Sequence, residues 1–182
     1  PVLFISAQQS YDFTDTELNK LKEFVNQGGT IFAEACCDGE NFDISFREAV
    51  KRMYSSGEAE LTRLGPEHEV FRSEYRLNPE TVELWGVDLG CRTAIIFSPR
   101  DLSCLWDKWR LHEPPDRPQH LSSMITKAAR IGVNVIAYAT GRELLDKLDE
   151  NEVVAVKGQQ DKVTRGLLQV AKIRHEGSWN TA

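Results

Sequence analysis

The first 35 residues contain two apolar runs separated by one capped amphipathic segment, and this order constrains the fold most strongly. The run PVLFIS (1–6) is continuous and apolar, which is typical of a strand buried on both faces. Thr14 and Glu17 form the capping-box pattern that starts a helix, and the glycine pair at 28–29 predicts its end. The run TIFAEA (30–35) predicts a second buried strand. Together they predict a right-handed βαβ unit in a parallel sheet.

The remaining elements are predicted from apolar spacing. Asp43 can cap a helix that continues to about Met53. RTAIIFS (92–98) predicts another central strand, and residues 54–90 contain only short strand or loop pieces. Helical spacing from Leu121 favours a helix that continues through NVIAYA to residue 139, although that segment also fits a strand.

The chain divides into three parts by composition. Residues 1–148 hold the α/β pattern and end in a short amphipathic helix at 142–148. Residues 149–164 form a polar linker. Residues 165–182 are strand-like, and they are either the start of a following domain or a strand added beside PVLFIS.

Charge and hydropathy exclude several classes of partner. The 182 residues carry a formal net charge of −6, with no basic run, so we expect no nucleic-acid binding. No apolar stretch approaches the roughly 20 residues that span a bilayer, so we expect a soluble fragment without direct membrane contact. The chain begins at Pro1, which suggests excision from a larger parent protein. That parent could be exported or membrane-associated, and the compartment stays open.

The longer motifs resemble a known family. They are LNKLKEFVNQGGTIFAEACCDGENFDISFREAVKRMY, PEHEVF, RTAIIFSPRDLSCLWDKW and GVNVIAYATG. Over roughly residues 1–145 they are similar to DUF4159, a bacterial family of class I glutamine-amidotransferase-like domains without an assigned function. The resemblance implies a flavodoxin-like, three-layer α/β domain with a mainly parallel central sheet. The segment 165–182 resembles the opening of such a domain, which suggests a tandem arrangement.

Cys37 is the one catalytic candidate. It lies at the centre of Ala-Cys-Cys-Asp-Gly (35–39), which matches the small-x-nucleophile-x-Gly turn of related hydrolases. Amidotransferases keep their base in an H-x-E sequence, and none of the four histidines has that context. We therefore expect no catalytic residue. There is no C-x-x-C pair, and we expect no metal centre and no cofactor.

A ligand site is predicted at the carboxyl ends of the strands, where open parallel sheets bind their ligands. Three of the carboxylates there could bind a hard cation, but a turn and a helix cap explain two of them better. An arginine of the second helix either pairs with Asp43 or holds a carboxylate in the crevice. The candidate ligand-binding residues are Glu34, Cys36, Cys37, Asp38, Arg47, Arg100 and Asp101.

The sequence allows three interpretations of the two adjacent cysteines. Cys36 and Cys37 are either small residues at the sheet's edge or partners for a disulfide, and Cys37 is alternatively a nucleophile. Cys37 and Cys104 both follow carboxyl ends of predicted parallel strands, so they could lie close together. Cys91 precedes its strand and is expected at the opposite edge.

These observations favour a non-catalytic binding module for a small ligand or a protein, with other domains of the parent protein as its partners. The alternative is a cysteine- or metal-dependent hydrolase or amidotransferase that uses the strand-end cluster around Cys37. A structural role, with aromatic loops docking a neighbouring domain, is a third reading.

Overall fold

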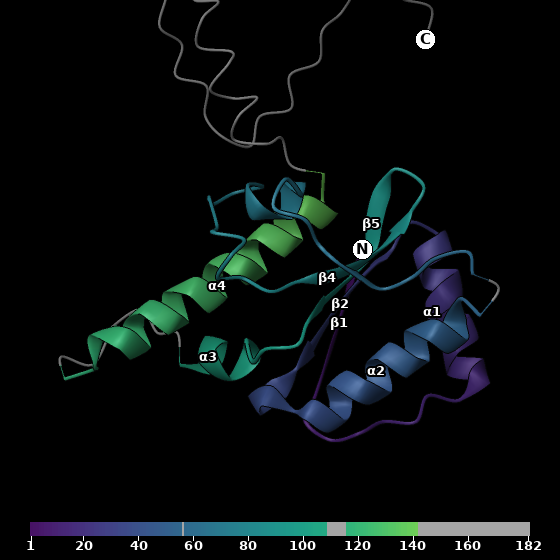
Figure 1. Ribbon diagram of the computed structural model, residues 1–182, viewed down its shortest axis with the longest axis horizontal. Coiled ribbons are helices and arrows are strands. Elements are labelled where there is room, and N and C mark those ends of the chain that lie inside the picture. Colours follow the sequence, from purple (N-terminus) through teal and green to yellow (C-terminus); the bar gives the residue numbers. More distant parts are fainter. Residues whose placement is uncertain (56, 109–115, 142–182) are drawn as a thin grey trace, which may run out of the picture. The chain divides into compact units, whose positions relative to one another are not determined.

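The computed structural model describes residues 1–55, 57–108 and 116–141, which form a five-stranded sheet with helices on both faces (Figure 1). The strands lie in the order β1-β2-β5-β4-β3. Their bounds are β1 (Val2–Ala7), β2 (Thr30–Ala35), β3 (Thr62–Arg63), β4 (Trp85–Leu89) and β5 (Arg92–Ser98). The helices are α1 (Asp15–Asn26), α2 (Glu40–Met53), α3 (Ser103–Asp107) and α4 (Gln119–Ala139), with single 3₁₀ turns η1 (Cys36–Asp38) and η2 (Glu69–Phe71). The predicted helix at 142–148, the linker and the segment 165–182 lie outside the described residues.

The βαβ unit is present as the sequence predicts. The Thr14 hydroxyl accepts a hydrogen bond from the Glu17 amide, and the Glu17 carboxylate accepts one from the Thr14 amide at 2.8 Å. The chain leaves α1 through Gly28, whose φ of 92° is in the left-handed region that favours glycine. β1 and β2 then pair in parallel, and β2 pairs in parallel with β5. These three strands place their carboxyl ends at one edge.

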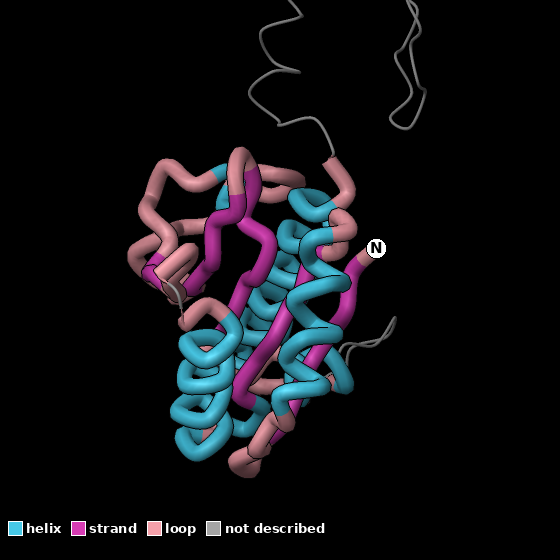
Figure 2. The backbone as a smooth tube through the Cα atoms, turned by 90° about the vertical axis from the view of Figure 1, so that its right-hand side faces the viewer, coloured by secondary structure: helices cyan, strands magenta, loops and turns pink. Residues whose placement is uncertain are grey.

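The two faces of the sheet carry separate apolar cores. Ile31, Ala33 and Ala35 of β2 pack in the core formed with α1 and α2. Phe32 points to the opposite face and packs in the core formed with α4. Figure 2 shows helices on both sides of the strands. The alternation along β2 is the period of two that a strand requires, with both faces buried.

The sequence-based expectation for β1 was wrong in one respect. Its apolar run suggested burial on both faces, but among the described residues β1 is an edge strand that pairs with β2 alone. Leu3 and Phe4, which point to opposite faces, are 37% and 41% exposed. An apolar run indicates a strand but does not distinguish a central strand from an edge strand.

The other half of the sheet is antiparallel. β4 turns through Gly90 and Cys91 into β5 and pairs with it antiparallel, and β3 pairs antiparallel with β4. The sequence offered only short strand pieces between residues 54 and 90, and this hairpin was not predicted. The sheet is therefore mixed, with three parallel strands and two antiparallel ones.

The start of α2 differs from its prediction, whereas α4 ends where it was predicted to end. α2 begins at Glu40, and its N-cap, Gly39, is four residues before the predicted cap at Asp43. Gly39 makes no side-chain cap, so the sequence pattern contained no capping signal at the true start. α4 continues to Ala139, as the helical spacing favoured. None of the helices in the described residues is both long and apolar enough to cross a membrane.

A buried polar network fixes the loop between β3 and β4 against α4. The Asn134 side chain of α4 is fully buried, donates to the carbonyls of Val70 and Tyr75, and accepts from the Tyr75 amide. In the same loop, His68 Nδ1 accepts from the Val70 amide, and His68 Nε2 lies 2.8 Å from Thr93 Oγ1 of β5. This arrangement of the imidazole places the proton on Nε2. His68 is therefore a structural residue rather than a solvated one.

Protonation of His68 should destabilise the fold. Burial lowers the pKa of His68 below its ordinary 6.5, although the nearby carboxylates of Asp88 and Glu69 oppose the shift. Below about pH 6.5 the unfolded chain therefore binds this proton before the folded chain does, and stability falls as the pH falls. We expect His68→Gln to reduce the loss of unfolding free energy between about pH 7 and about pH 5.5, measured by urea denaturation.

The matched control is His120→Gln, at an exposed position near the start of α4. It should retain the pH dependence of the unmodified protein. An unchanged pH dependence in His68→Gln would contradict the assignment.

Candidate ligand site at the carboxyl ends of the strands

The candidate site is formed by the two loops that leave β2 and β5. These strands are parallel neighbours, and Glu34 is paired in register with Ser98. The first loop is the η1 turn, which leads into α2. The second loop runs from Pro99 to Leu102 and leads into α3. Parallel pairing therefore brings residues 36–38 and 101–104 to the same edge of the sheet.

Glu34 joins the two loops from within the sheet. Its side chain is fully buried, and its carboxylate accepts hydrogen bonds from the amides of Leu102 at 2.8 Å and Ser103 at 2.9 Å. It also accepts one from the Ser6 hydroxyl of β1 at 2.8 Å. A buried carboxylate is tolerated only when such donors replace its hydration. Glu34 was predicted as a ligand, but these protein donors make it the anchor of the β5–α3 loop.

The η1 turn has an unusual backbone. Cys37 and Asp38 have φ values of 54° and 52°, so two consecutive non-glycine residues are in the left-handed region. Such conformations cost on the order of 1 kcal/mol or more each and persist where surrounding structure imposes them. Gly39 follows, and a Cβ at this position would lie 2.5 Å from the Gln8 carbonyl oxygen. The chain after β1 therefore presses directly on the turn, and only glycine fits there.

Three thiols meet at this edge. Cys37 Sγ lies 3.0 Å from Cys104 Sγ, and Cys36 Sγ lies 3.4 Å from Cys104 Sγ and 3.5 Å from Cys37 Sγ. A carboxylate oxygen of Asp101 completes a group of four donor atoms that all lie within 4.8 Å of one another. Cys37 is exposed, whereas the other three are partly buried. We call these four residues the cysteine cluster.

The cluster favours neutral thiols. Hydrogen bonds to Cys37 and Cys36, burial and the charge of Asp101 all raise the pKa of Cys104 far above the ordinary value. A hydrogen bond with Cys104 lowers the pKa of Cys37, but Cys36, burial and the Asp101 charge together raise it above its ordinary value. In the part of the chain that the structure describes, the cluster contains no histidine.

The other predicted ligand residues are spread around the edge. Asp101 accepts from the Cys104 amide at 3.3 Å, and so it caps the first turn of α3 while belonging to the cluster. Asp38 is exposed in the η1 turn. The Arg100 side chain points to solvent, with Nε 4.0 Å from a Glu83 carboxylate oxygen. The structure therefore brings together Cys36, Cys37 and Asp101, and leaves Asp38 and Arg100 outside.

Arg47 makes an ion pair within α2 and a ring contact with β4. Its Nε pairs with Asp43 one turn earlier in α2, and its guanidinium covers the Trp85 ring at 4.1 Å from the ring centre. This is the helix-surface pair that the i, i+4 spacing suggested. In the structure the guanidinium is engaged by Asp43 and Trp85, and among the described residues it does not hold a carboxylate at the strand ends.

Cys104 is the functional residue that the sequence-based ligand set omitted. The available signal was its position shortly after a parallel strand, which had suggested proximity to Cys37. Cys91 lies in the β4–β5 turn at the opposite end of the sheet, as expected. Trp106 packs between β1 and α4, where its Nε1 donates to the Ala128 carbonyl, whereas Trp109 lies outside the described residues.

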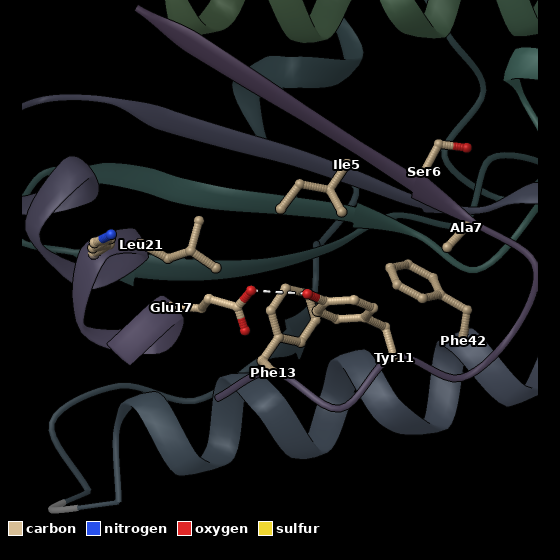
Figure 3. A pocket seen from close by; sticks show the side chains of 9 residues that line it. Ile5, Ser6, Ala7, Tyr11, Phe13, Glu17, Leu21 and Phe42 are labelled. Carbon is tan, nitrogen blue, oxygen red and sulfur yellow. Dashed lines mark hydrogen bonds between the residues drawn. The ribbon is translucent and has the colours of Figure 1, made fainter. Parts of the chain in front are cut away.

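A small hollow lies at the carboxyl end of β1. Its volume is about 420 Å³, and Ile5, Ala7, Leu21 and Phe42 give it an apolar lining (Figure 3). The Tyr11 hydroxyl donates to the Glu17 carboxylate at 2.8 Å across its mouth. Glu17 is already used in the α1 capping box, and Ser6 donates to Glu34.

A larger groove of about 900 Å³ runs between β1 and α4. It is mostly apolar, and it adjoins the open side of the edge strand. The apolar side chains that line it include Val2, Phe4 and Phe32 from the strands, Trp106 from α3, and Val133 and Ile136 from α4.

Removal of the Glu34 carboxylate should uncouple the two loops. Glu34→Ala leaves the amides of Leu102 and Ser103 buried without an acceptor, and we expect it to lower the unfolding free energy by roughly 3 kcal/mol. Glu34→Gln retains one acceptor oxygen and should lose less. Urea denaturation measures both.

The matched control for Glu34→Ala is Glu48→Ala, on the exposed side of α2. It should change the unfolding free energy by less than about 0.5 kcal/mol. A loss below about 1 kcal/mol in Glu34→Ala would show that the carboxylate does not hold the loop.

A known protein family matches most of the residues that the structure describes. The sequence matches the family model "Domain of unknown function (DUF4159)" over residues 1–140. No curated protein matches the sequence. The match contains both loops of the cysteine cluster and all five strands, and the chain belongs to the DUF4159 family.

Proposed function

We propose that this chain is a flavodoxin-like, glutamine-amidotransferase-like domain that acts as a non-catalytic binding module in a larger bacterial protein. The fold proposal is supported by the parallel strands β1, β2 and β5 and by helices on both faces of the sheet. The functional proposal is carried by one observation. The edge at which a nucleophile would act holds three closely packed thiols, with no histidine in the cluster among the described residues.

The details of the cluster support binding rather than catalysis. A cysteine nucleophile reacts as the thiolate, which a neighbouring base or cation must stabilise. Here Cys37 faces two other thiols and the Asp101 carboxylate, and these surroundings raise its pKa. Glu34 is fully occupied by the Leu102 and Ser103 amides and the Ser6 hydroxyl, so it cannot serve as the missing base.

Thiol reactivity distinguishes this proposal from the alternative, a cysteine-dependent hydrolase or amidotransferase. The reduced, metal-free chain is alkylated with iodoacetamide over a pH series, and tandem mass spectrometry assigns the modified cysteine. We expect Cys37 to react slowly at neutral pH, because its surroundings raise the pKa of its thiol, and to accelerate only in alkaline solution.

Cys91 provides an internal reference, since it is exposed at the opposite end of the sheet. Cys37 should react more slowly than Cys91 at neutral pH. If Cys37 instead reacts much faster than Cys91, with half-maximal reactivity near neutrality, the binding-module proposal fails and the hydrolase gains support.

A second surface favours docking of another domain of the same polypeptide. The segment Val2–Ala7 contains no charged residue and no proline, and its pairing with β2 is continuous in register. Natural edge strands usually carry charges, prolines or bulges that prevent further pairing. In the part of the chain that the structure describes, this edge carries no such protection, and Leu3 and Phe4 are exposed on its opposite faces, which fits the addition of one more strand.

The groove beside β1 would receive the side chains of that strand or its attached helix. Phe4, Trp106, Val133 and Ile136 give it an apolar lining, and Val133 and Ile136 are exposed on α4. We propose that the occupant is an extended segment from a neighbouring domain, which pairs with β1 and covers this groove.

Hydrogen exchange tests this docking in the parent polypeptide. Amides of β1 that point away from β2 should exchange more slowly there than in the 182-residue chain, because a new strand accepts their hydrogen bonds. Phe4→Lys should restore fast exchange. Ile44→Lys, at a 62% exposed position on α2, should not.

Equal exchange of β1 in both proteins would contradict the docking proposal. Dimerisation of the 182-residue chain through β1, detected by light scattering and abolished by Phe4→Lys, would also contradict it. That result would identify a second copy as the occupant.

A further inference from the structure

We infer that the cysteine cluster is a structural site for a thiolate-binding divalent metal ion, with Zn²⁺ as the best match. The ligands would be the Sγ atoms of Cys36, Cys37 and Cys104 and a carboxylate oxygen of Asp101. This inference deepens the proposed function, because it names the ligand of the same strand-end site, and it rests on that site being non-catalytic.

The spacing of the donor atoms is close to that of a tetrahedral metal site. Zn–S bonds of about 2.3 Å place the sulfurs of such a site about 3.8 Å apart. The three Sγ–Sγ distances are 3.0, 3.4 and 3.5 Å, so each pair needs to open by less than about 1 Å. The Asp101 oxygen lies within 4.8 Å of all three sulfurs and can complete the fourth position.

The kinds of donor select the metal. Thiolates bind Zn²⁺ and other soft or borderline ions, whereas Mg²⁺ and Ca²⁺ require shells of oxygen ligands. The cluster offers three sulfurs and one carboxylate, and so it does not suit a hard cation. Four protein ligands also leave no open position for substrate or reactive water, which is the pattern of structural rather than catalytic zinc.

A disulfide explains less of the arrangement. It would join two of the three sulfurs at about 2.05 Å and leave the third thiol and Asp101 without a role. One metal ion uses all four groups. It would also neutralise the negative charge that deprotonation of the thiols creates beside Asp101.

The surrounding structure holds the donors in place before any metal arrives. Glu34 fixes the start of α3 through the Leu102 and Ser103 amides, and Cys104 and Asp101 flank that point. On the other loop, the left-handed Cys37 and the tightly packed Gly39 fix the turn that carries the remaining sulfurs. Cys37 is exposed and gives the ion a route of entry.

The chemistry of thiol ligands sets the expected pH dependence. A thiol binds a metal ion as the thiolate, so the ion competes with protons for each sulfur. Binding should therefore release protons, and the affinity should rise with pH.

Cobalt and zinc binding to the reduced 182-residue chain test the inference. Addition of Co²⁺ should produce thiolate-to-cobalt charge-transfer absorption together with the intense visible bands of a tetrahedral site. Zn²⁺ should displace the cobalt with a stoichiometry of about one ion per chain. Mg²⁺ should not displace it.

Three variants locate the site. Cys104→Ser should weaken zinc binding by more than about 100-fold, as measured by competition with a chromogenic chelator, and Asp101→Asn should weaken it less. Cys91→Ser is the matched control and should bind as the unmodified chain does. Circular dichroism and urea denaturation of each variant verify that it is folded.

Absence of thiolate-to-cobalt absorption in the fully reduced chain would overturn the inference. Equal zinc affinity in Cys104→Ser and Cys91→Ser would also overturn it, because the metal would then bind elsewhere. Either result leaves the binding-module proposal intact, provided that Cys37 of the metal-free chain reacts slowly at neutral pH. A rapidly reacting Cys37 refutes that proposal independently of any metal.

Discussion

The buried carboxylate of Glu34 is the interaction on which the arrangement of the strand-end edge depends. A carboxylate at the centre of a sheet loses its hydration, and only directed donors can compensate for that loss. The Leu102 and Ser103 amides and the Ser6 hydroxyl provide them, each within 3 Å. Because two of these donors belong to the loop after β5, the loop cannot be placed elsewhere without leaving the charge unpaired. The position of α3 is therefore a consequence of one residue in β2.

That constraint explains why cysteines distant in sequence meet. Cys36 and Cys37 leave β2 directly after Glu34, while Cys104 follows the amides that Glu34 binds. The Glu34 carboxylate, which secures the loop, thus also sets the distance between Cys104 and the two cysteines of the η1 turn. The crowding has an electrostatic cost for thiolates, since each would lie beside other thiols and Asp101. A bound divalent cation would stabilise the thiolates with its positive charge. A site that disfavours a nucleophilic thiolate can therefore suit a metal ion.

Local signals in the sequence were sufficient for much of the fold. The strands at 30–35 and 92–98 and the capped helix α1 were predictable because their apolar runs and capping residues act over a few positions. The position of β1 at an exposed edge of the described sheet was not predictable, since it depends on which strands pair. The true start of α2 was missed because Gly39 caps it through shape and backbone alone. In the site, the proximity of Cys104 to Cys37 was predictable because both follow parallel strands. The contact of Arg47 with the Trp85 ring was not, since it depends on tertiary packing.

The edge strand and the cysteine cluster are physically connected. Ser6 belongs to β1, lies opposite Glu34 in register, and donates to the carboxylate that holds the α3 loop. Its hydroxyl also lies 3.4 Å from the Ser103 hydroxyl. A shift of β1 along β2 would therefore remove one of the donors that compensate the buried charge. The open edge must be kept in register for the cluster to keep its geometry, so a strand that pairs with β1 would stabilise the cluster without touching it.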